Sequence, residues 1–166
     1  MTASVLFRRR NLVFALTFAV LLFVTGAAHA QGIGFAGGVT VDPEKAFVGT
    51  HFETGELFRG FRFRPGVDGA FGDDYSLATI NIEFLYYFEM GRSGWAIYQG
   101  GGPAIVLLRR NAGPLSNADT SVHAGTFVTF GFAHEKGFFT DFRIGSGEHP
   151  TLKFGAGYTV RFNQRP

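Results

Sequence analysis

The last segment of the chain alternates strictly between apolar side chains and small or polar ones. From Thr151 to Phe162 every second residue is apolar, whereas Lys153 and Arg161 belong to the other set. Successive side chains of a β-strand point to opposite faces, so this pattern predicts a strand with one apolar face and one small, polar or cationic face. The surroundings of each face decide the class of protein.

Seven further segments after Gln31 have strand-like patterns, and no long run has helical periodicity. The eight predicted strands are Gly32–Val41, Ala46–Thr54, Phe58–Val67, Ser76–Phe88, Trp95–Leu108, Ser121–Ala133, Phe138–Gly145 and Thr151–Phe162. Most are about 9 to 13 residues long, whereas strands of globular proteins are typically about 5–6 and membrane-spanning strands about 9–11. Short and longer polar connections tend to alternate between them, which is typical of outer-membrane barrels.

The same alternation separates bulky apolar residues from small and charged ones in the other strands. Along residues 76–88, Ile82 and Phe84 lie on the face opposite Asn81 and Glu83. A soluble barrel or sandwich would turn the apolar set inward, and this alternative accounts for each strand taken alone. The strand lengths, the phenylalanine-rich apolar faces and the glycine-rich polar faces favour lipid outside and the polar set inside a narrow barrel.

A barrel interior that carries charged residues needs both signs, because an unpaired buried charge is strongly unfavourable. The predicted inward set contains both signs. We therefore expect a charge network inside the barrel, made of Glu53, Arg62, Arg64, Glu83, Asp141, Arg143, Lys153 and Arg161.

Aromatic residues and the fifth strand refine this picture. Phe88, Trp95 and Phe162 are expected at the periplasmic rim, where amphipathic rings favour the bilayer interface. Phenylalanine-rich strands also place rings everywhere, which is the simpler interpretation. Residues 95–108 lose the alternation, and Pro103 has no N–H to donate to a neighbouring strand. A bulge at Pro103, or an exit from the membrane there, would reconcile this strand with a closed barrel.

Residues 1–30 are predicted to be a cleaved signal peptide. Arginines at positions 8–10 precede a 13-residue apolar run from Leu12 to Val24, and Ala28 and Ala30 fit cleavage after Ala30. A retained anchor is the disfavoured alternative, because a spanning helix needs about 20 residues. Residues 31–166 then form the outer-membrane barrel domain.

Removal of this segment reverses the sign of the net charge. Three of the 15 Lys and Arg residues lie in it, so residues 31–166 carry 12 basic against 13 acidic residues, a net charge near −1. This balance gives no argument for a nucleic-acid partner. The chain has no cysteine, which excludes disulfides and thiol chemistry. Its 24 glycines and 21 phenylalanines suit close-packed strands with a bulky apolar face.

Candidate catalytic groups lie near the longer loops. Ser121 and His123 share a strand face, and with Asp119 nearby they could hydrolyse a lipid ester. Ser146 and His149 form a weaker pair. Ordinary loop and interior polarity accounts for both pairs, so we do not predict an enzyme and keep a lipid-modifying hydrolase as an alternative.

Other motifs carry no chemistry. The segment Gly32–Gly37 satisfies G-x-G-x-x-G but lacks the preceding strand and following helix that a dinucleotide site needs. No two histidines have metal-ligand spacing on one strand face, and Asp68, Asp73 and Asp74 supply too few ligands for a cation site. We therefore expect no cofactor and no metal.

The leader, the strand pattern and the closing segment KFGAGYTVRF resemble the small eight-stranded outer-membrane β-barrel proteins of the OmpA/OmpX-like type. The resemblance covers the whole mature chain and implies an all-β, antiparallel, up-and-down transmembrane barrel. It also implies that the assembly machinery for such barrels reads a terminal aromatic residue. Phe162 matches that position, although four residues follow it.

The expected function is a structural or interaction role through external loops. A barrel of this diameter is filled by side chains, so we do not predict a general porin. Expected partners are outer-membrane lipid, lipopolysaccharide and the barrel assembly machinery, and the protein is expected to be a monomer. Arg109 and Arg110 could bind lipopolysaccharide phosphates, unless they are a solvated loop pair. A soluble, lipocalin-like periplasmic barrel with an apolar cavity is a further alternative.

Overall fold

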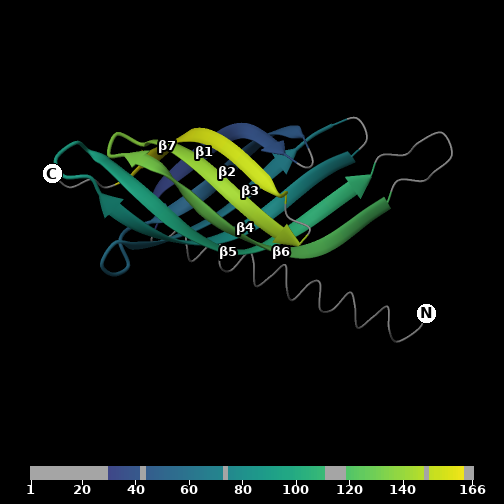
Figure 1. The fold of residues 1–166 in the computed structure, drawn as a ribbon, viewed down its shortest axis with the longest axis horizontal. Coiled ribbons are helices and arrows are strands. Elements are labelled where there is room, and N and C mark those ends of the chain that lie inside the picture. The colour runs from purple at the N-terminus through teal and green to yellow at the C-terminus, as the bar shows by residue number, and fades with distance from the viewer. Residues whose placement is uncertain (1–29, 42–43, 73–74, 111–118, 148–149, 163–166) are drawn as a thin grey trace.

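Each strand pairs antiparallel with the next in the sequence, and the first strand pairs with the last to close the barrel (Figure 1). The computed structural model describes residues 30–41, 44–72, 75–110, 119–147 and 150–162. The strands are β1 Ala30–Val41, β2 Lys45–Thr54, β3 Phe61–Ala70, β4 Tyr75–Glu89, β5 Trp95–Arg110, β6 Asp119–His134, β7 Phe138–Gly147 and β8 Leu152–Arg161. Among the described residues, no helix is long and apolar enough to span a bilayer. The predicted eight-stranded up-and-down barrel is confirmed.

The third strand begins later than predicted. Phe58 was expected to start it, but the strand starts at Phe61, and Phe58 forms only an isolated bridge to Phe61. Between them, Arg59 and Gly60 have φ of 40° and 84°, a left-handed conformation that breaks an extended strand. A short apolar run alone could not reveal this turn.

Strand β5 runs through Pro103 without the predicted bulge. The register against β4 is the same on both sides, with Asn81 opposite Ala104 and Phe84 opposite Gly101, and the pairing with β6 is continuous. The ladder between β4 and β5 omits the pairs between these two positions. We attribute the gap to the missing N–H of Pro103, which removes a donor on the β4 side while the strand keeps its direction.

The apolar faces of the strands point outward and the charged faces inward. Large apolar side chains are exposed on all eight strands; Phe35 on β1 is 60% exposed and Val48 on β2 is 62% exposed. Inside, Arg64 is 1% exposed and Lys153 is 2% exposed. The soluble lipocalin-like alternative required the opposite arrangement, with apolar side chains inside, and is contradicted by this one.

The two ends of the barrel differ. We call the end with the β4–β5 and β6–β7 turns the turn end, and the opposite end the loop end. At the loop end, β5 and β6 pair as far as Arg110 and Asp119, whereas β7 pairs with β6 only from Gly125 onward. The β5–β6 hairpin therefore extends beyond β7 there (Figure 1). The expected alternation of connection lengths is weak, because β3 and β4 extend into the predicted loop and leave only residues 71–74 between them.

Candidate functional site

Charged and apolar side chains alternate in layers along the barrel interior. Nearest the loop end lies an apolar cluster of Phe47, Ala70, Leu77 and Val106. A second cluster, nearer the turn end, contains Leu85, Tyr87, Tyr98, Ala133 and Phe139. Between them lies the central cluster, defined as Arg64, Asp68, Glu83, Asp141, Arg143 and Lys153. The register explains this order, because inward positions two residues apart along a strand lie at successive depths.

Two guanidinium groups organise the central cluster. The Nε of Arg64 donates to Glu83 at 2.5 Å and its Nη2 to Asp141 at 3.2 Å. The Nη2 of Arg143 lies 2.8 Å from Glu83 and 2.6 Å from Asp141. Arg64 on β3 and Arg143 on β7 thus bridge the same two carboxylates, those of Glu83 and Asp141. Such charge-assisted contacts offset the desolvation of the buried charges.

Asp68 completes the cluster on its loop-end side. Its carboxylate accepts hydrogen bonds from Lys153 and, at 2.6 Å, from the amide of Asn81, and it lies 3.6 Å from Arg143. The pairing of Lys153 with Asp68 was not anticipated, because Asp68 had been considered only with Asp73 and Asp74, which lie outside the described residues. Its inward position on the same strand face as Arg62 and Arg64 was the available signal.

Neutral donors also hold Asp141 in place. The hydroxyl of Tyr98 donates to it at 2.9 Å and that of Thr129 at 2.8 Å. Sequence reasoning missed both, although Thr129 lies on the predicted polar face of its strand. The weak alternation of β5 gave no indication that Tyr98 points into the barrel. With these bonds, Asp141 receives contacts from β3, β5, β6 and β7.

A separate mouth cluster lies at the turn end and consists of Glu53, Arg62, Tyr87 and Arg161. The Nη1 of Arg62 donates to Glu53 at 2.7 Å, and the hydroxyl of Tyr87 donates to the other carboxylate oxygen at 3.0 Å. Arg161 approaches Glu53 at 4.0 Å. The Arg62 guanidinium also stacks over the Tyr87 ring, 4.3 Å from its centroid.

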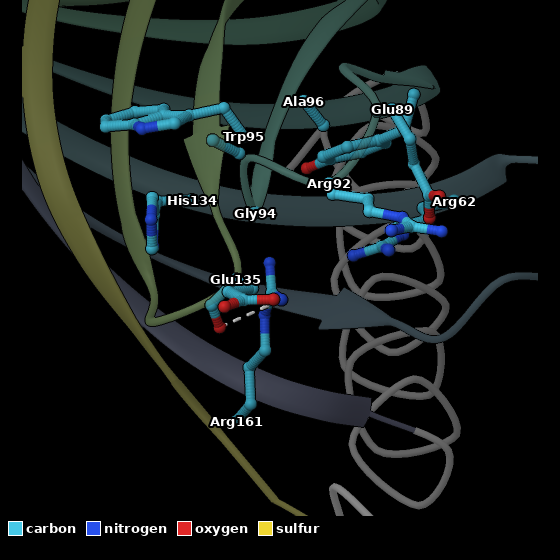
Figure 2. A pocket seen from close by; sticks show the side chains of 12 residues that line it. Arg62, Glu89, Arg92, Gly94, Trp95, Ala96, His134, Glu135 and Arg161 are labelled. Atoms are coloured by element: carbon cyan, nitrogen blue, oxygen red, sulfur yellow. Dashed lines mark hydrogen bonds between the residues drawn. The ribbon is translucent and has the colours of Figure 1, made fainter.

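Arg62, Tyr87 and Arg161 of the mouth cluster line a cavity of about 220 Å³ (Figure 2). In the figure, Arg62, Arg92 and Glu89 gather on one side, Arg161 and Glu135 lie together below, and Trp95 and His134 lie on the other side. The dashed line marks the hydrogen bond from Arg161 to the backbone carbonyl of Glu135, 3.4 Å long. The cavity is therefore bordered by the half-buried Arg62 and Arg161 and by the exposed Glu89, Arg92 and Glu135.

The structure brings Ser121 and His123 together but adds no acid to the pair. The Ser121 hydroxyl lies 2.8 Å from Nε2 of His123. Asp119 is exposed, and no hydrogen bond or ion pair joins it to His123 within the described residues. In the second candidate pair, Ser146 instead contacts Thr126 at 2.9 Å, and His149 lies outside the described residues. The described residues thus contain a serine–histidine pair without the orienting carboxylate of a triad.

Phe88, Trp95 and Phe162 are all exposed and lie at the turn end. Tyr86, which was expected close to this rim, contacts both Phe61 at 4.9 Å and Phe88 at 4.6 Å between ring centroids. Sequence reasoning missed Phe58 and Phe61 at this end, and Phe58 stacks on Phe61 at 4.8 Å. The rings thus form a continuous row across the outer surface of β3 and β4.

Arg109 and Arg110 are exposed at the loop end of β5 and lie opposite Thr120 and Asp119 in the β5–β6 register. Nothing in the structure indicates a ligand for them. Within the described ranges, no group of three or more His, Asp or Glu side chains is placed to hold a metal ion.

Comparison with known proteins rests on the fold alone. No protein-family model matches the chain, and no curated protein matches it by sequence. The N-terminal β-barrel domain of Pseudomonas aeruginosa OprF superposes with a TM-score of 0.62 at 13% identity, covering 80% of this chain and 98% of that domain. Neisserial surface protein A superposes with a TM-score of 0.53 at 14% identity, covering 79% and 94%.

The fold is that of the small outer-membrane β-barrels. The likeness extends over 98% of the OprF domain and 94% of Neisserial surface protein A. At such low identity the likeness carries no residue roles, and the chemistry of the interior must be argued from this chain.

Proposed function

We propose that this chain is an outer-membrane barrel with a filled lumen that serves a structural or interaction role through its loop end. The observation that carries the proposal is the inverted distribution of polarity, with charged side chains buried and large apolar side chains exposed on every strand. On a monomeric soluble protein, the largest contiguous exposed apolar patch is usually only about 300–600 Å². A bilayer accommodates such a surface.

Strand length supports the same proposal. The strands contain 10 to 16 residues, and a tilted strand needs about 9–11 residues to cross a bilayer. Because the barrel is closed, no strand edge is left open to the hydrocarbon core, where an unpaired edge would be strongly unfavourable. The row of aromatic rings at the turn end, with Trp95 and Phe162, fits an interface belt.

The interior supports a filled lumen. The central cluster joins side chains from β3, β4, β7 and β8 across the barrel, and apolar clusters lie on both sides of it. Eight-stranded barrels are just wide enough for side chains to fill. A general porin, which needs an open aqueous channel, does not fit this interior.

Electrophoresis tests the proposal. The chain with its leader would be produced in a Gram-negative host, and unboiled and boiled outer membranes compared on a detergent gel. We expect a band in the membrane fraction that shifts on boiling, because a closed barrel resists detergent until heated. A soluble periplasmic band without a shift would reject the outer-membrane assignment. N-terminal sequencing of the same band tests cleavage after Ala30.

The proposed orientation places the turn end in the periplasm. The start of β1 and the end of β8 both lie at the turn end, and the hairpin that projects furthest lies at the loop end. The loop end would then contact lipopolysaccharide through Arg109 and Arg110, while the barrel assembly machinery would read Phe162.

Each of these two contacts has its own test. Replacing both arginines with glutamine should weaken binding to lipopolysaccharide micelles. Deleting residues 163–166 should speed assembly if these trailing residues hinder recognition of Phe162.

A lipid-modifying hydrolase is the second candidate, and the 2.8 Å contact between Ser121 and His123 is the observation in its favour. A histidine at this distance can accept a serine proton. The Ser121→Ala variant provides the test. If the lipid ester profile of the outer membrane is the same with the variant as with the parent chain, this function is rejected.

A further inference from the structure

The two charged clusters inside the barrel differ in their balance. In the central cluster, three cations meet three carboxylates. In the mouth cluster, Arg62 and Arg161 share the single carboxylate of Glu53. Both arginine side chains are largely buried, 23% and 21% exposed. Because such charges are unfavourable without a partner, the mouth cluster carries one positive charge more than its own carboxylate neutralises.

The hydrogen-bond donors of the mouth cluster show the same deficit. The Nε atoms of Arg62 and Arg161 are buried and have no hydrogen-bond partner among the described residues. The Nε of Arg143 also lacks a partner, but the terminal nitrogens of that residue already contact three carboxylates. Arg161, by contrast, has only the 4.0 Å approach to Glu53 and a 3.4 Å bond to a backbone carbonyl.

Charges on the outer rim do not remove the excess. Glu89 and Glu135 line the same cavity, but both are exposed, and the exposed Arg92 and Lys136 lie in the same two turns. Exposed charges are screened by water and salt and contribute little to one another. The uncompensated charge therefore belongs to the inner pair, Arg62 and Arg161.

We propose that the cavity at the turn end binds a phosphate group. Arg62 on β3 and Arg161 on β8 border it from two sides, the exposed Arg92 of the β4–β5 turn lies on the same side as Arg62 (Figure 2), and the cavity of about 220 Å³ has room for a phosphate and a small substituent. The paired N–H groups of a guanidinium can donate two hydrogen bonds to the oxygens of one phosphate, and a tetrahedral anion accepts hydrogen bonds from several directions. This inference goes beyond the proposed function and requires only the folded barrel.

Two sources could supply the phosphate. Free phosphate can enter from solvent through the open mouth. A glycerophospholipid headgroup is the other source, because the cavity extends to Trp95, which is exposed on the outer rim. The chemistry of recognition is the same for both.

The test is a titration of the folded full-length chain in an amine-oxide detergent and a phosphate-free buffer. Inorganic phosphate is added while the Nε–H resonances of the arginines are followed by NMR. We expect saturable shifts for Arg62 and Arg161. Arg161→Gln should raise the dissociation constant about 10- to 100-fold, the usual effect of losing a hydrogen bond to a charged group. Arg109→Gln, at the opposite end, is the matched control and should leave it unchanged.

A second variant changes affinity in the opposite direction. Glu53→Gln keeps an acceptor for Arg62 and Tyr87 but removes the competing negative charge. Phosphate should then bind roughly tenfold more tightly, since net attraction grows with each unpaired charge. A heat shift on a detergent gel shows independently that each variant is folded, so failure of this proposal is distinguishable from failure of the barrel assignment.

The sources are separated with sn-glycero-3-phosphoglycerol, a soluble headgroup. Tighter binding of this compound than of inorganic phosphate indicates a lipid, and the reverse indicates free phosphate; both outcomes support a phosphate site. The proposal is overturned if neither compound gives saturable shifts in the folded barrel, or if Arg161→Gln binds phosphate as well as the parent chain does.

Discussion

At the residue scale, Arg64 is the side chain on which the barrel interior depends most directly. It is 1% exposed and bridges Glu83 and Asp141. We expect Arg64→Met to lower the free energy of unfolding by about 3–5 kcal/mol, because removing one partner leaves buried carboxylates unpaired. Urea unfolding in lipid vesicles, followed by the fluorescence of the single tryptophan, Trp95, measures this.

The exposed Arg92, at the turn end, is the control for that measurement. Arg92→Met should change the free energy of unfolding by less than about 0.5 kcal/mol, since surface substitutions of this kind are nearly neutral. Equal effects of the two substitutions would contradict the importance given to the central cluster.

Gly131 on β6 shows how a small residue makes room for a large one. A Cβ at this position would clash with the backbone carbonyl oxygen of Thr140 on β7 and would lie 2.6 Å from the Tyr98 hydroxyl, which shares its one proton between that carbonyl and Asp141. Gly131→Val should therefore displace both Tyr98 and the neighbouring backbone of β7 and destabilise the barrel by about 1–3 kcal/mol, as is usual for overpacking. The same urea titration measures the loss.

Ala124→Val is the matched control for Gly131→Val, because Ala124 lies on the outward face of the same strand and is exposed. It should be close to neutral. A Gly131→Val barrel as stable as the parent would show that Tyr98 and the β7 backbone at Thr140 can move without cost.

At the element scale, substitutions on the outward face of β6 test whether this face lies in the bilayer. Val128 is 55% exposed, and it lies six residues from His134 at the turn end of the strand. At about 3.3 Å per residue and a tilt of about 40°, this places Val128 roughly 15 Å deep, near the bilayer midplane. Val128→Arg should destabilise the barrel in vesicles by about 2–4 kcal/mol.

Val122 supplies the matched control, because it is the same residue type on the same face, 59% exposed and nearer the loop end. Val122→Arg should cost only about 0–1 kcal/mol, as is found near the interface. If the two substitutions had equal effects, the depth that the proposed orientation assigns to β6 would be rejected.

The sequence predicts the strands well where one face differs strongly from the other. On β4, Phe84 points outward and Glu83 inward, so it is clear which alternate residues face the interior. On β5 the strand itself was predicted, but the expected bulge at Pro103 is absent. Gly100, Gly101 and Gly102 on successive positions remove the contrast between the faces there. The parity nevertheless continues through them, with Tyr98 buried before the glycines and Val106 buried after them.

Partners across the lumen were less predictable than the strands. Alternation shows that Lys153 points inward, but it contacts Asp68 on β3, which is not a sequence neighbour of β8. Such contacts depend on the relative heights of strands on opposite sides of the barrel, which follow from the stagger of the closed sheet and from no local pattern. The mouth cluster was hidden for the same reason, although each of its charged members had been assigned to the interior.

At the scale of the whole molecule, the central cluster should control passage of ions. In planar bilayers we expect the parent chain to give no stable porin-sized conductance, because buried side chains cross the lumen at this level. Replacing Arg64 and Arg143 together with alanine removes two large side chains and leaves Asp68, Glu83 and Asp141 against Lys153. This variant should conduct, and with the excess of carboxylates it should prefer cations.

The reversal potential in a potassium chloride gradient measures that preference, and a heat shift on a detergent gel verifies that the double variant is folded. Alanine at the exposed Arg92 and Arg109 removes the same charge from the two ends of the barrel and is the control, which should remain closed. A large conductance from the parent chain would contradict the filled lumen. A folded double variant that stays closed would assign the barrier to the apolar clusters around Phe47 and Tyr98, because these are the remaining layers that ions must cross.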